Sequence, residues 1–406
     1  MTTKIFVIKQ KNLGRKKRKM ENYDIVVVGA GPAGLMAARK AGEKNVRVLL
    51  VEKQSMLGVK ACGEAVSTRT ITDAEIQPSQ KFISNKVKGA FIYAPDEKKR
   101  VEIFSEELGQ GYILEKPAFL RELAYHAAKN NVDFWVNSEV LDVLKNGENY
   151  IVKVKKFGKI LEVKTKIVLG CDGVNSTVAK KFFSREGYRL ISCIQYRMVN
   201  CRFEDPHALE CYLGREVAPL GYVWVFPKTE NVGNVGIGVR GAPAKPYLDK
   251  FIEKHPEKFG KAKIVEVQAA PVPVSGQIEK IVDGGVMVCG DAAGQVIPLT
   301  GGGIHSSIVA GKVAGEVAAE FLGGKTKSLE EYPKRYTYWT KRIRDSLKAL
   351  KVIEKLTDRE LNQLADVLSG TDVVDLASGI DVRRVALKLL KHPYFALRIT
   401  KSLLGE

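Results

Sequence analysis

The chain has 406 residues, of which 45% are hydrophobic and 27% charged, and its formal net charge is +19. This length and composition predict a folded protein with a sizeable core and exclude an intrinsically disordered chain. No run of about 18 predominantly apolar residues occurs, so we expect no membrane-spanning helix. The cysteines form no CxxC pair and the histidines have no metal-ligand spacing, so we expect a reducing, cytoplasmic compartment and no metal.

The chain begins with a basic arm. Residues 1–19 contribute eight Lys and Arg residues and no acid, and the remainder carries about +11 once these eight are set aside. Two interpretations stay open: the arm is a real tail able to bind anionic lipid or nucleic acid, or translation starts at Met20. The positive charge of the remainder suits peripheral contact with an anionic membrane surface. We expect no nucleic acid partner.

The first predicted elements are a nucleotide-binding strand and helix. Residues 25–28 are an apolar run typical of a buried parallel strand, and GAGPAG follows at 29–34, where a helix is predicted to begin. Gly29 permits a tight turn, Gly31 lets the backbone approach a pyrophosphate, and Gly34 lets helix and strand pack closely. The helix N-terminus supplies N–H donors for the phosphates.

Two further strand ends extend this nucleotide site. Residues 48–51 predict a strand that ends at Glu52, whose carboxylate can accept hydrogen bonds from a ribose diol. Residues 286–290 predict another strand, followed by Asp291 and by a glycine-rich helix start at 301–304. A carboxylate there can bind a ribityl or pyrophosphate group, and the helix start can place N–H groups against the flavin C2 carbonyl. The combination favours FAD over NAD.

The remaining segments predict a second sheet and a helical region. Residues 87–104 and 191–239 alternate apolar and polar side chains between turn residues, which predicts a mostly antiparallel sheet. From about residue 329, apolar residues recur at helical spacing. We therefore predict an α/β fold elaborated toward α+β. Its discontinuous Rossmann-like FAD domain comprises residues 22–80, 105–185 and 270–326, its inserted substrate-binding sheet domain residues 81–104 and 186–269, and its C-terminal helical region residues 327–406.

The order of these motifs resembles the aromatic hydroxylase-like flavoprotein superfamily over residues 22–325, because GCDGVNS at 170–176 lies between the first and last nucleotide elements. Two further pieces are similar to the archaeal geranylgeranyl reductase family, whose members saturate isoprenoid chains of membrane lipids. KACGEA at 60–65 resembles the segment that the family places beside the flavin ring. PLGYVWVFP at 219–227 matches the family pattern PxxYxWxFP at every fixed position.

The resemblance implies noncovalent FAD and a set of contact residues. Carried over position by position, and together with Gly29 and Gly31 of the glycine motif, these are Gly34, Glu52, Cys62, Gly63, Ala65, Lys116, Val140, Asp291, Gly303 and Ile304. Lys116 departs from the family pattern, which has arginine there. A lysine keeps the charge but loses the bidentate fork, and Arg121 is an alternative flavin contact.

The implied reaction is reduction of an isolated alkene by hydride from reduced flavin, with a proton delivered to the other carbon in a dry site. Tyr222, Trp224 and Phe226 alternate along one predicted strand, so they point to one face and, with Pro227, form a candidate slot for a prenyl chain. Ordinary sheet core is the alternative. Cys62, His305 and Tyr222 are the catalytic candidates. The alternative for Cys62 is a small buried hydrophobe, and the alternative for His305 is a cap or packing group at a helix start.

The sequence leaves the partner and two competing functions open. The electron donor is a nicotinamide such as NAD(P)H, a ferredoxin or a reduced deazaflavin. The substrate is geranylgeranyl diphosphate or a digeranylgeranylglycerophospholipid, and the enzyme is cytoplasmic or peripheral at the membrane. A flavin monooxygenase or halogenase of the same fold is the competing enzyme. A prenyl-lipid binding protein that retains flavin only structurally is the non-enzymatic alternative.

Overall fold

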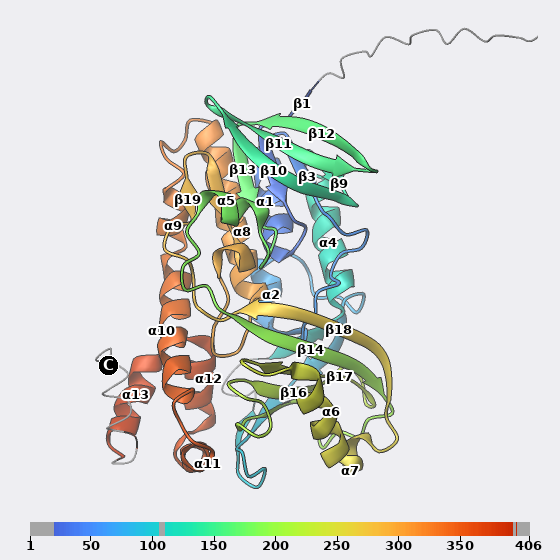
Figure 1. The fold of residues 1–406 in the computed structure, drawn as a ribbon, viewed down its shortest axis with the longest axis vertical. Helices are drawn as coiled ribbons and strands as arrows, with labels where there is room; N and C mark the ends of the chain where they lie inside the picture. The colour runs from blue at the N-terminus through green and yellow to red at the C-terminus, as the bar shows by residue number, and fades with distance from the viewer. Residues whose placement is uncertain (1–19, 105–109, 393–394, 396–406) are drawn as a thin grey trace, which may run out of the picture.

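The structure is a computed structural model that describes residues 20–104, 110–392 and 395. The arm 1–19 lies outside the described residues, and so do most residues after 392. In the orientation of Figure 1, two sheets with their helices occupy the upper half, a large sheet occupies the lower half, and the C-terminal helices run along one side. Both interpretations of residues 1–19, a real basic tail or a start of translation at Met20, therefore stay predictions.

A six-stranded sheet carries the predicted nucleotide elements. Its order is β19 (Val282–Asp283), β20 (Val286–Val288), β13 (Ile167–Gly170), β2 (Ile25–Val28), β3 (Val48–Val51) and β9 (Val132–Trp135). All pairs are parallel except β19 with β20. Val and Ile runs buried on both faces are typical of such a sheet. Because the strands are parallel, the turns that follow β2, β3, β13 and β20 lie at the same edge.

Two helices that begin at this edge pack closely against each other. They are α1 (Pro32–Gly42) and α8 (Ile304–Leu322). A Cβ on Gly311 would lie 2.0 Å from the Ala33 carbonyl oxygen, and one on Gly315 would lie 2.3 Å from that of Ala37. Glycine at these two positions therefore allows the backbones to touch.

A seven-stranded sheet forms the lower half. Its order is β18 (Lys263–Pro273), β14 (Leu190–Val199), β17 (Val232–Val239), β16 (Tyr222–Pro227), β15 (Ala208–Tyr212), β6 (Gly89–Tyr93) and β7 (Arg100–Phe104). Its pairs are antiparallel except β15 with β6. One face packs against α6 (Ala244–Lys254) and α7 (Pro256–Phe259) around Val223, Val225 and Phe251. The other face is free to line a cavity.

Two smaller sheets complete the β structure. One has the order β4 (Ala65–Ser67), β8 (Gly111–Leu114) and β5 (Ile83–Val87), and the other β1 (Glu21–Asn22), β12 (Lys159–Thr165), β11 (Asn149–Lys156) and β10 (Ser138–Asn146). We predicted that residues 81–104 join the inserted sheet. The strand pairing differs, because β5 pairs with β8 and only β6 and β7 enter the seven-stranded sheet.

The C-terminal region is helical. Its helices are α9 (Glu331–Arg335), α10 (Thr337–Ile353), α11 (Asp358–Val367), α12 (Gly370–Ser378) and α13 (Val382–Leu390). Elsewhere in the described residues lie α2 (Thr68–Asp73), α4 (Lys116–Ala128), α5 (Thr177–Phe182) and the 3₁₀ turn Gly290–Ala293. Thr357 and Ser369 each form a capping box that begins a helix. Leu364, Val385 and Leu389 bury the apolar faces against one another.

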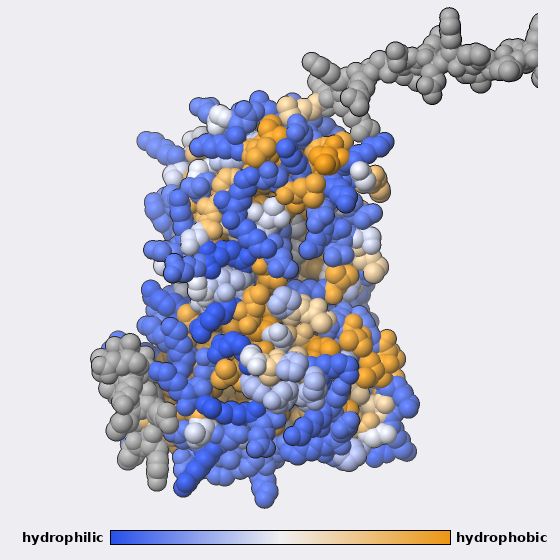
Figure 2. All heavy atoms as spheres, viewed as in Figure 1, coloured by the Kyte–Doolittle hydropathy of each residue, from blue (hydrophilic) through white to orange (hydrophobic). Residues whose placement is uncertain are grey.

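The surface is mixed in polarity. On the face drawn in Figure 2, hydrophilic side chains cover most of the surface, and apolar side chains gather in its middle. Among the described residues, none of the helices is both long enough and apolar enough to cross a membrane.

Candidate active site

One cavity of about 930 Å³ lies between the two large sheets and the C-terminal helices. At one end it is lined by the glycine turn after β2, and at the other by β16 and by Trp339 and Leu350 of α10. The segment 60–65 lies between these ends. The three regions of the fold therefore meet around one space.

The glycine turn has the shape that a pyrophosphate requires. Gly29 has a φ of +97°, and a Cβ there would lie 2.4 Å from the Cys171 carbonyl oxygen. A Cβ on Gly34 would lie 1.9 Å from the Gly29 carbonyl oxygen, so this glycine packs helix against turn and lies outside the cavity lining. A Cβ on Gly31 would meet no atom of the described residues within 4 Å. Gly31 therefore faces the cavity with bare backbone, as the binding of a phosphate needs.

Two carboxylates stand at this end of the cavity. Glu52 accepts hydrogen bonds from the backbone N–H of Ala30 at 2.7 Å and of Gln54 at 2.8 Å. Asp291 forms an ion pair with the Lys60 ammonium, a contact that the sequence did not predict. The remaining lone pairs of both carboxylates can accept from hydroxyl groups. The other predicted cofactor contacts that line the cavity are Cys62, Gly63, Ala65, Lys116, Val140, Gly303 and Ile304.

Lys116 and Arg121 are placed differently, although both belong to α4. Lys116 is buried at the start of the helix, and its ammonium donates to the Lys60 carbonyl oxygen. Arg121 is exposed and lies outside the cavity lining. Five residues along a helix correspond to about 140° of rotation, which turns the two side chains to nearly opposite faces. Lys116 therefore points toward the cavity and Arg121 points away from it.

The aromatic residues of β16 share one face, as predicted. Tyr222, Trp224 and Phe226 all line the cavity, whereas Val223 and Val225 are fully buried in the core on the opposite face. The Tyr222 and Trp224 rings lie with centroids 5.9 Å apart.

Polar atoms of these rings are held in place. The Tyr222 hydroxyl donates to the Thr300 carbonyl oxygen at 2.6 Å, and the Trp224 indole N–H donates to Gln195 Oε1 at 2.9 Å. Burial raises the pKa of Tyr222 well above its ordinary value, so the phenol stays protonated. Pro227 lies outside the cavity lining, because it follows Phe226 on the strand and points to the opposite face, and its carbonyl oxygen accepts from Asn85. Its role in substrate binding stays a prediction.

Cys62 and Gly63 face the aromatic strand. The Cys62 sulfur accepts from the Glu64 backbone N–H at 3.3 Å. A Cβ on Gly63 would lie 2.7 Å from two atoms of the Phe226 ring, so backbone and ring are in direct contact. Cys193 of β14 also lines the cavity, and burial raises its pKa to about 12, which keeps this second thiol protonated.

His305 forms a pair with Asp73 across the start of α8. Its Nε2 lies 2.7 Å from Asp73 Oδ2, and its ring stands edge-on to Trp339 with centroids 4.7 Å apart. Burial lowers the pKa of His305, and the nearby Asp73 carboxylate opposes that shift. His305 lines the cavity, but its polar edge is engaged by Asp73. The sequence predicts His305 as a site residue but gives no sign of its contact with Asp73.

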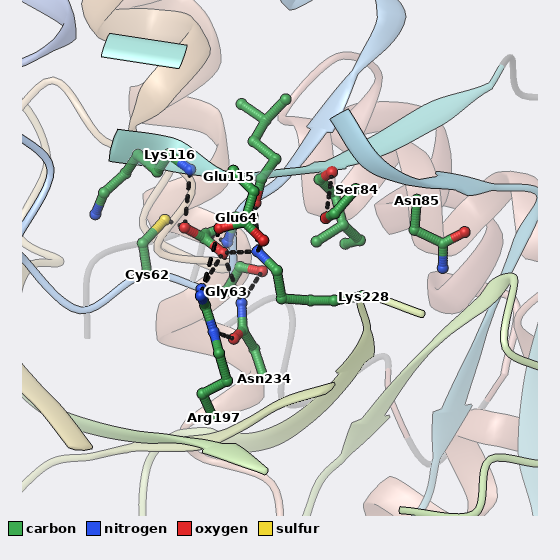
Figure 3. A network of polar contacts seen from close by, with 12 residues as sticks. Cys62, Gly63, Glu64, Ser84, Asn85, Glu115, Lys116, Arg197, Lys228 and Asn234 are labelled. Carbon is green, nitrogen blue, oxygen red and sulfur yellow. Dashed lines mark hydrogen bonds and ion pairs between the residues drawn. The ribbon is translucent and has the colours of Figure 1, made fainter. Parts of the chain in front are cut away.

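A buried polar network beside Gly63 was also missed (Figure 3). Glu64 is 4% exposed, and its carboxylate accepts from Arg197 at 3.1 Å, Lys228 at 2.5 Å and Asn234 at 2.9 Å. The backbone N–H of Lys116 donates to its other oxygen at 3.0 Å. A signal existed, because Asn234 stands inside the otherwise apolar run 232–239. Its partner on a distant loop could not be inferred.

Two family models match the chain. The model described as the geranylgeranyl reductase catalytic domain matches residues 190–272, which include β14, β16 and most of β18. The model described as an FAD dependent oxidoreductase matches residues 24–175, which include the glycine turn and Glu52. The two matches therefore cover opposite ends of the cavity.

Whole proteins are similar over nearly their full length. A digeranylgeranylglycerophospholipid reductase of Methanocaldococcus jannaschii is 35% identical over 94% of this chain and 98% of its own. One of Methanococcus vannielii is 37% identical over 95% and 99%, respectively.

Solved structures show the same likeness. A geranylgeranyl bacteriochlorophyll reductase-like protein of Thermoplasma acidophilum superimposes with a TM-score of 0.84 at 33% identity, covering 95% of this chain and 100% of that chain. A flavin-dependent brominase superimposes with a TM-score of 0.74 at 17% identity, covering 92% and 100%, which is a likeness of fold alone.

Proposed function

The chain belongs to the digeranylgeranylglycerophospholipid reductase family, and from this premise we propose how its cavity saturates the geranylgeranyl chains of a lipid precursor. The protein is an FAD-dependent oxidoreductase that acts on CH–CH groups, with a prenyl lipid as substrate and a redox partner as electron source. The resemblance read from the sequence is thereby confirmed. The residue roles that follow are proposals.

FAD is bound noncovalently along the six-stranded sheet. The bare backbone at Gly31 and the helix start behind it suit the pyrophosphate, and Glu52 suits a ribose diol. Asp291, Gly303 and Lys116 line the path toward the aromatic strand. When bound and reduced, FAD supplies the hydride for the alkene.

The prenyl chain lies between the segment 60–65 and β16. The observation that carries this proposal is the aromatic face, because Tyr222, Trp224 and Phe226 enter the same cavity as the glycine turn. Apolar walls bind an isoprenoid chain and exclude water from the reacting carbons. The inward-facing aromatic side chains therefore support an apolar slot next to the proposed FAD-binding site.

The second alkene carbon needs a proton. Cys62 is our first candidate for proton donor or positioning group, since it lines the cavity beside the Gly63–Phe226 contact. His305 is a second candidate, with Asp73 holding its ring. The Tyr222 phenol is the third, and burial keeps it protonated. Turnover and its pH profile, measured for Cys62→Ser and for His305→Gln, distinguish the first two candidates.

The experiment that tests the function is anaerobic reoxidation of the dithionite-reduced protein. A geranylgeranyl lipid is expected to restore the oxidised flavin spectrum, whereas the fully saturated lipid is not. Flavin that reoxidises at the same rate with either lipid would contradict the proposal and favour a structural flavin.

The source of electrons and the place of action complete the proposal. The donor is NAD(P)H, a ferredoxin or a reduced deazaflavin, and the rate at which each reduces the bound flavin separates them. The protein acts in the cytoplasm and meets its lipid at the membrane surface, which the positive charge of about +11 outside residues 1–19 supports.

Replacing Glu52 with alanine is expected to weaken FAD retention by about 1.5–3 kcal/mol, the usual contribution of a hydrogen bond to a charged group. The dissociation constant of FAD, titrated by flavin fluorescence, measures the effect. Glu162→Ala is the control, because Glu162 is an exposed acid on β12. Equal FAD affinity in both variants would remove Glu52 from the cofactor site.

A further inference from the structure

Among the described residues, every group that contacts the buried carboxylate of Glu64 is a hydrogen-bond donor. One oxygen accepts from the backbone N–H of Lys116, and the other accepts from Arg197, Lys228 and Asn234. A glutamine of the same shape would place its amide N–H₂ against one of these donor groups. A carboxylate is therefore required for a fully satisfied site.

These donors come from elements far apart in the sequence. Lys116 begins α4, Arg197 lies on β14, Lys228 follows β16, and Asn234 lies on β17. Lys228 is 2% exposed and also donates to the Leu114 carbonyl oxygen at 2.7 Å. The carboxylate thus joins the seven-stranded sheet to the segment that carries Cys62.

The backbone of this segment is held as well. Glu64 has a φ of +68°, which is uncommon for a residue with a side chain. Its carbonyl oxygen accepts from the Leu114 N–H at 2.9 Å, and the Gly63 carbonyl oxygen accepts from Asn234 at 3.3 Å. The side-chain contacts therefore offset a backbone conformation that is itself unfavourable.

From these contacts we infer that Glu64 is a positioning residue, which fixes Cys62 and Gly63 against Phe226 and so sets the width of the prenyl slot. The inference rests on the proposed function, because the slot matters only if a prenyl chain occupies it. Glu64 acts through its neighbours and has no role in hydride or proton transfer.

The test compares Glu64→Gln with Glu210→Gln. Glu210 is a matched control: it is a fully buried carboxylate on β15 that accepts from Lys258 at 2.6 Å and Tyr212 at 2.5 Å, and it lies outside the cavity lining. The readout is single-turnover reoxidation of the reduced flavin by a geranylgeranyl lipid. Melting temperature and FAD content are measured beside it.

Both variants are expected to melt at lower temperature, but only Glu64→Gln is expected to slow reoxidation. The expected factor is about ten- to a hundredfold, because a displacement of about 1 Å at a reacting group can cost a hundredfold. FAD content and reduction by dithionite are expected to stay near the wild-type values in both.

A double variant keeps the inference testable if Glu64→Gln folds poorly. Glu64→Gln with Lys228→Met removes the buried ammonium that the single variant leaves without the Glu64 charge, and Glu115, the other carboxylate paired with Lys228 at 2.9 Å, is 39% exposed and stays solvated. Stability is therefore expected to recover while reoxidation stays slow. Recovery of reoxidation together with stability would overturn the positioning role, and so would equal slowing in Glu210→Gln. If the wild-type protein itself fails to respond to the lipid, the proposed function fails instead.

Discussion

Truncating Trp224 to alanine is expected to slow reduction of long prenyl chains by tens to several hundredfold, with little change in the spectrum of the bound flavin. Loss of a large aromatic wall removes on the order of 2–4 kcal/mol of apolar contact, which appears in the rate if the contact acts in the transition state. The measurement is turnover on short and long prenyl substrates. The effect should grow with chain length.

Trp224→Ala is also expected to lower stability, and this loss must be separated from the effect on turnover. Trp224 donates to the buried Gln195, and its ring lies over Gly236, where a Cβ would come within 2.2 Å. Val225→Ala is the matched control, because Val225 is the next residue on the strand and faces the core. If Trp224→Ala loses stability but keeps its relative turnover across chain lengths, the aromatic strand is core and the slot is elsewhere.

Adding a single methyl group at Gly63 is expected to reduce turnover on every prenyl substrate by about five- to 150-fold. The new Cβ would lie 2.7 Å from two atoms of the Phe226 ring, so the ring or the segment must move. Overpacking of this kind costs about 1–3 kcal/mol, which corresponds to that range of rates. Steady-state turnover of Gly63→Ala with reduced enzyme measures it.

The steric origin can be checked by making room on the other side. In Gly63→Ala with Phe226→Leu, the smaller side chain is expected to restore part of the turnover lost in the single variant. FAD content should stay constant in both variants. Turnover that is unaffected by Gly63→Ala would show that the substrate does not pass between Gly63 and Phe226.

The sequence predicted the local elements well, because their signals are local. The Ile and Val run before Gly29 predicts a strand at 25–28, and the apolar run before Glu52 predicts one at 48–51; these are the bounds of β2 and β3. Alternation along 222–226 predicted the shared aromatic face, since successive strand residues point to opposite sides. The helical spacing expected from about residue 329 is likewise found in the helices α9 to α13.

Features that depend on distant pairing were harder to predict. The sequence predicts residues 81–104 as one piece of the inserted sheet, because nothing local shows that β5 pairs with β8 instead. Glu64 and its donors are separated by 52 to 170 residues, and nothing local links them. The sequence offers Arg121 as an alternative to Lys116 from its charge alone, and charge does not show that the rotation of α4 turns it away from the cavity.

The reduced protein is expected to add hydrogen to the double bonds of a geranylgeranyl lipid. The most direct test is mass spectrometry of a digeranylgeranylglycerophospholipid after anaerobic incubation with the dithionite-reduced, FAD-loaded protein. The expected products are heavier by two hydrogen atoms for each double bond reduced, and they are absent when the protein is omitted. Unchanged lipid would contradict this expectation, and so would a product that gains oxygen instead when the incubation is repeated in air.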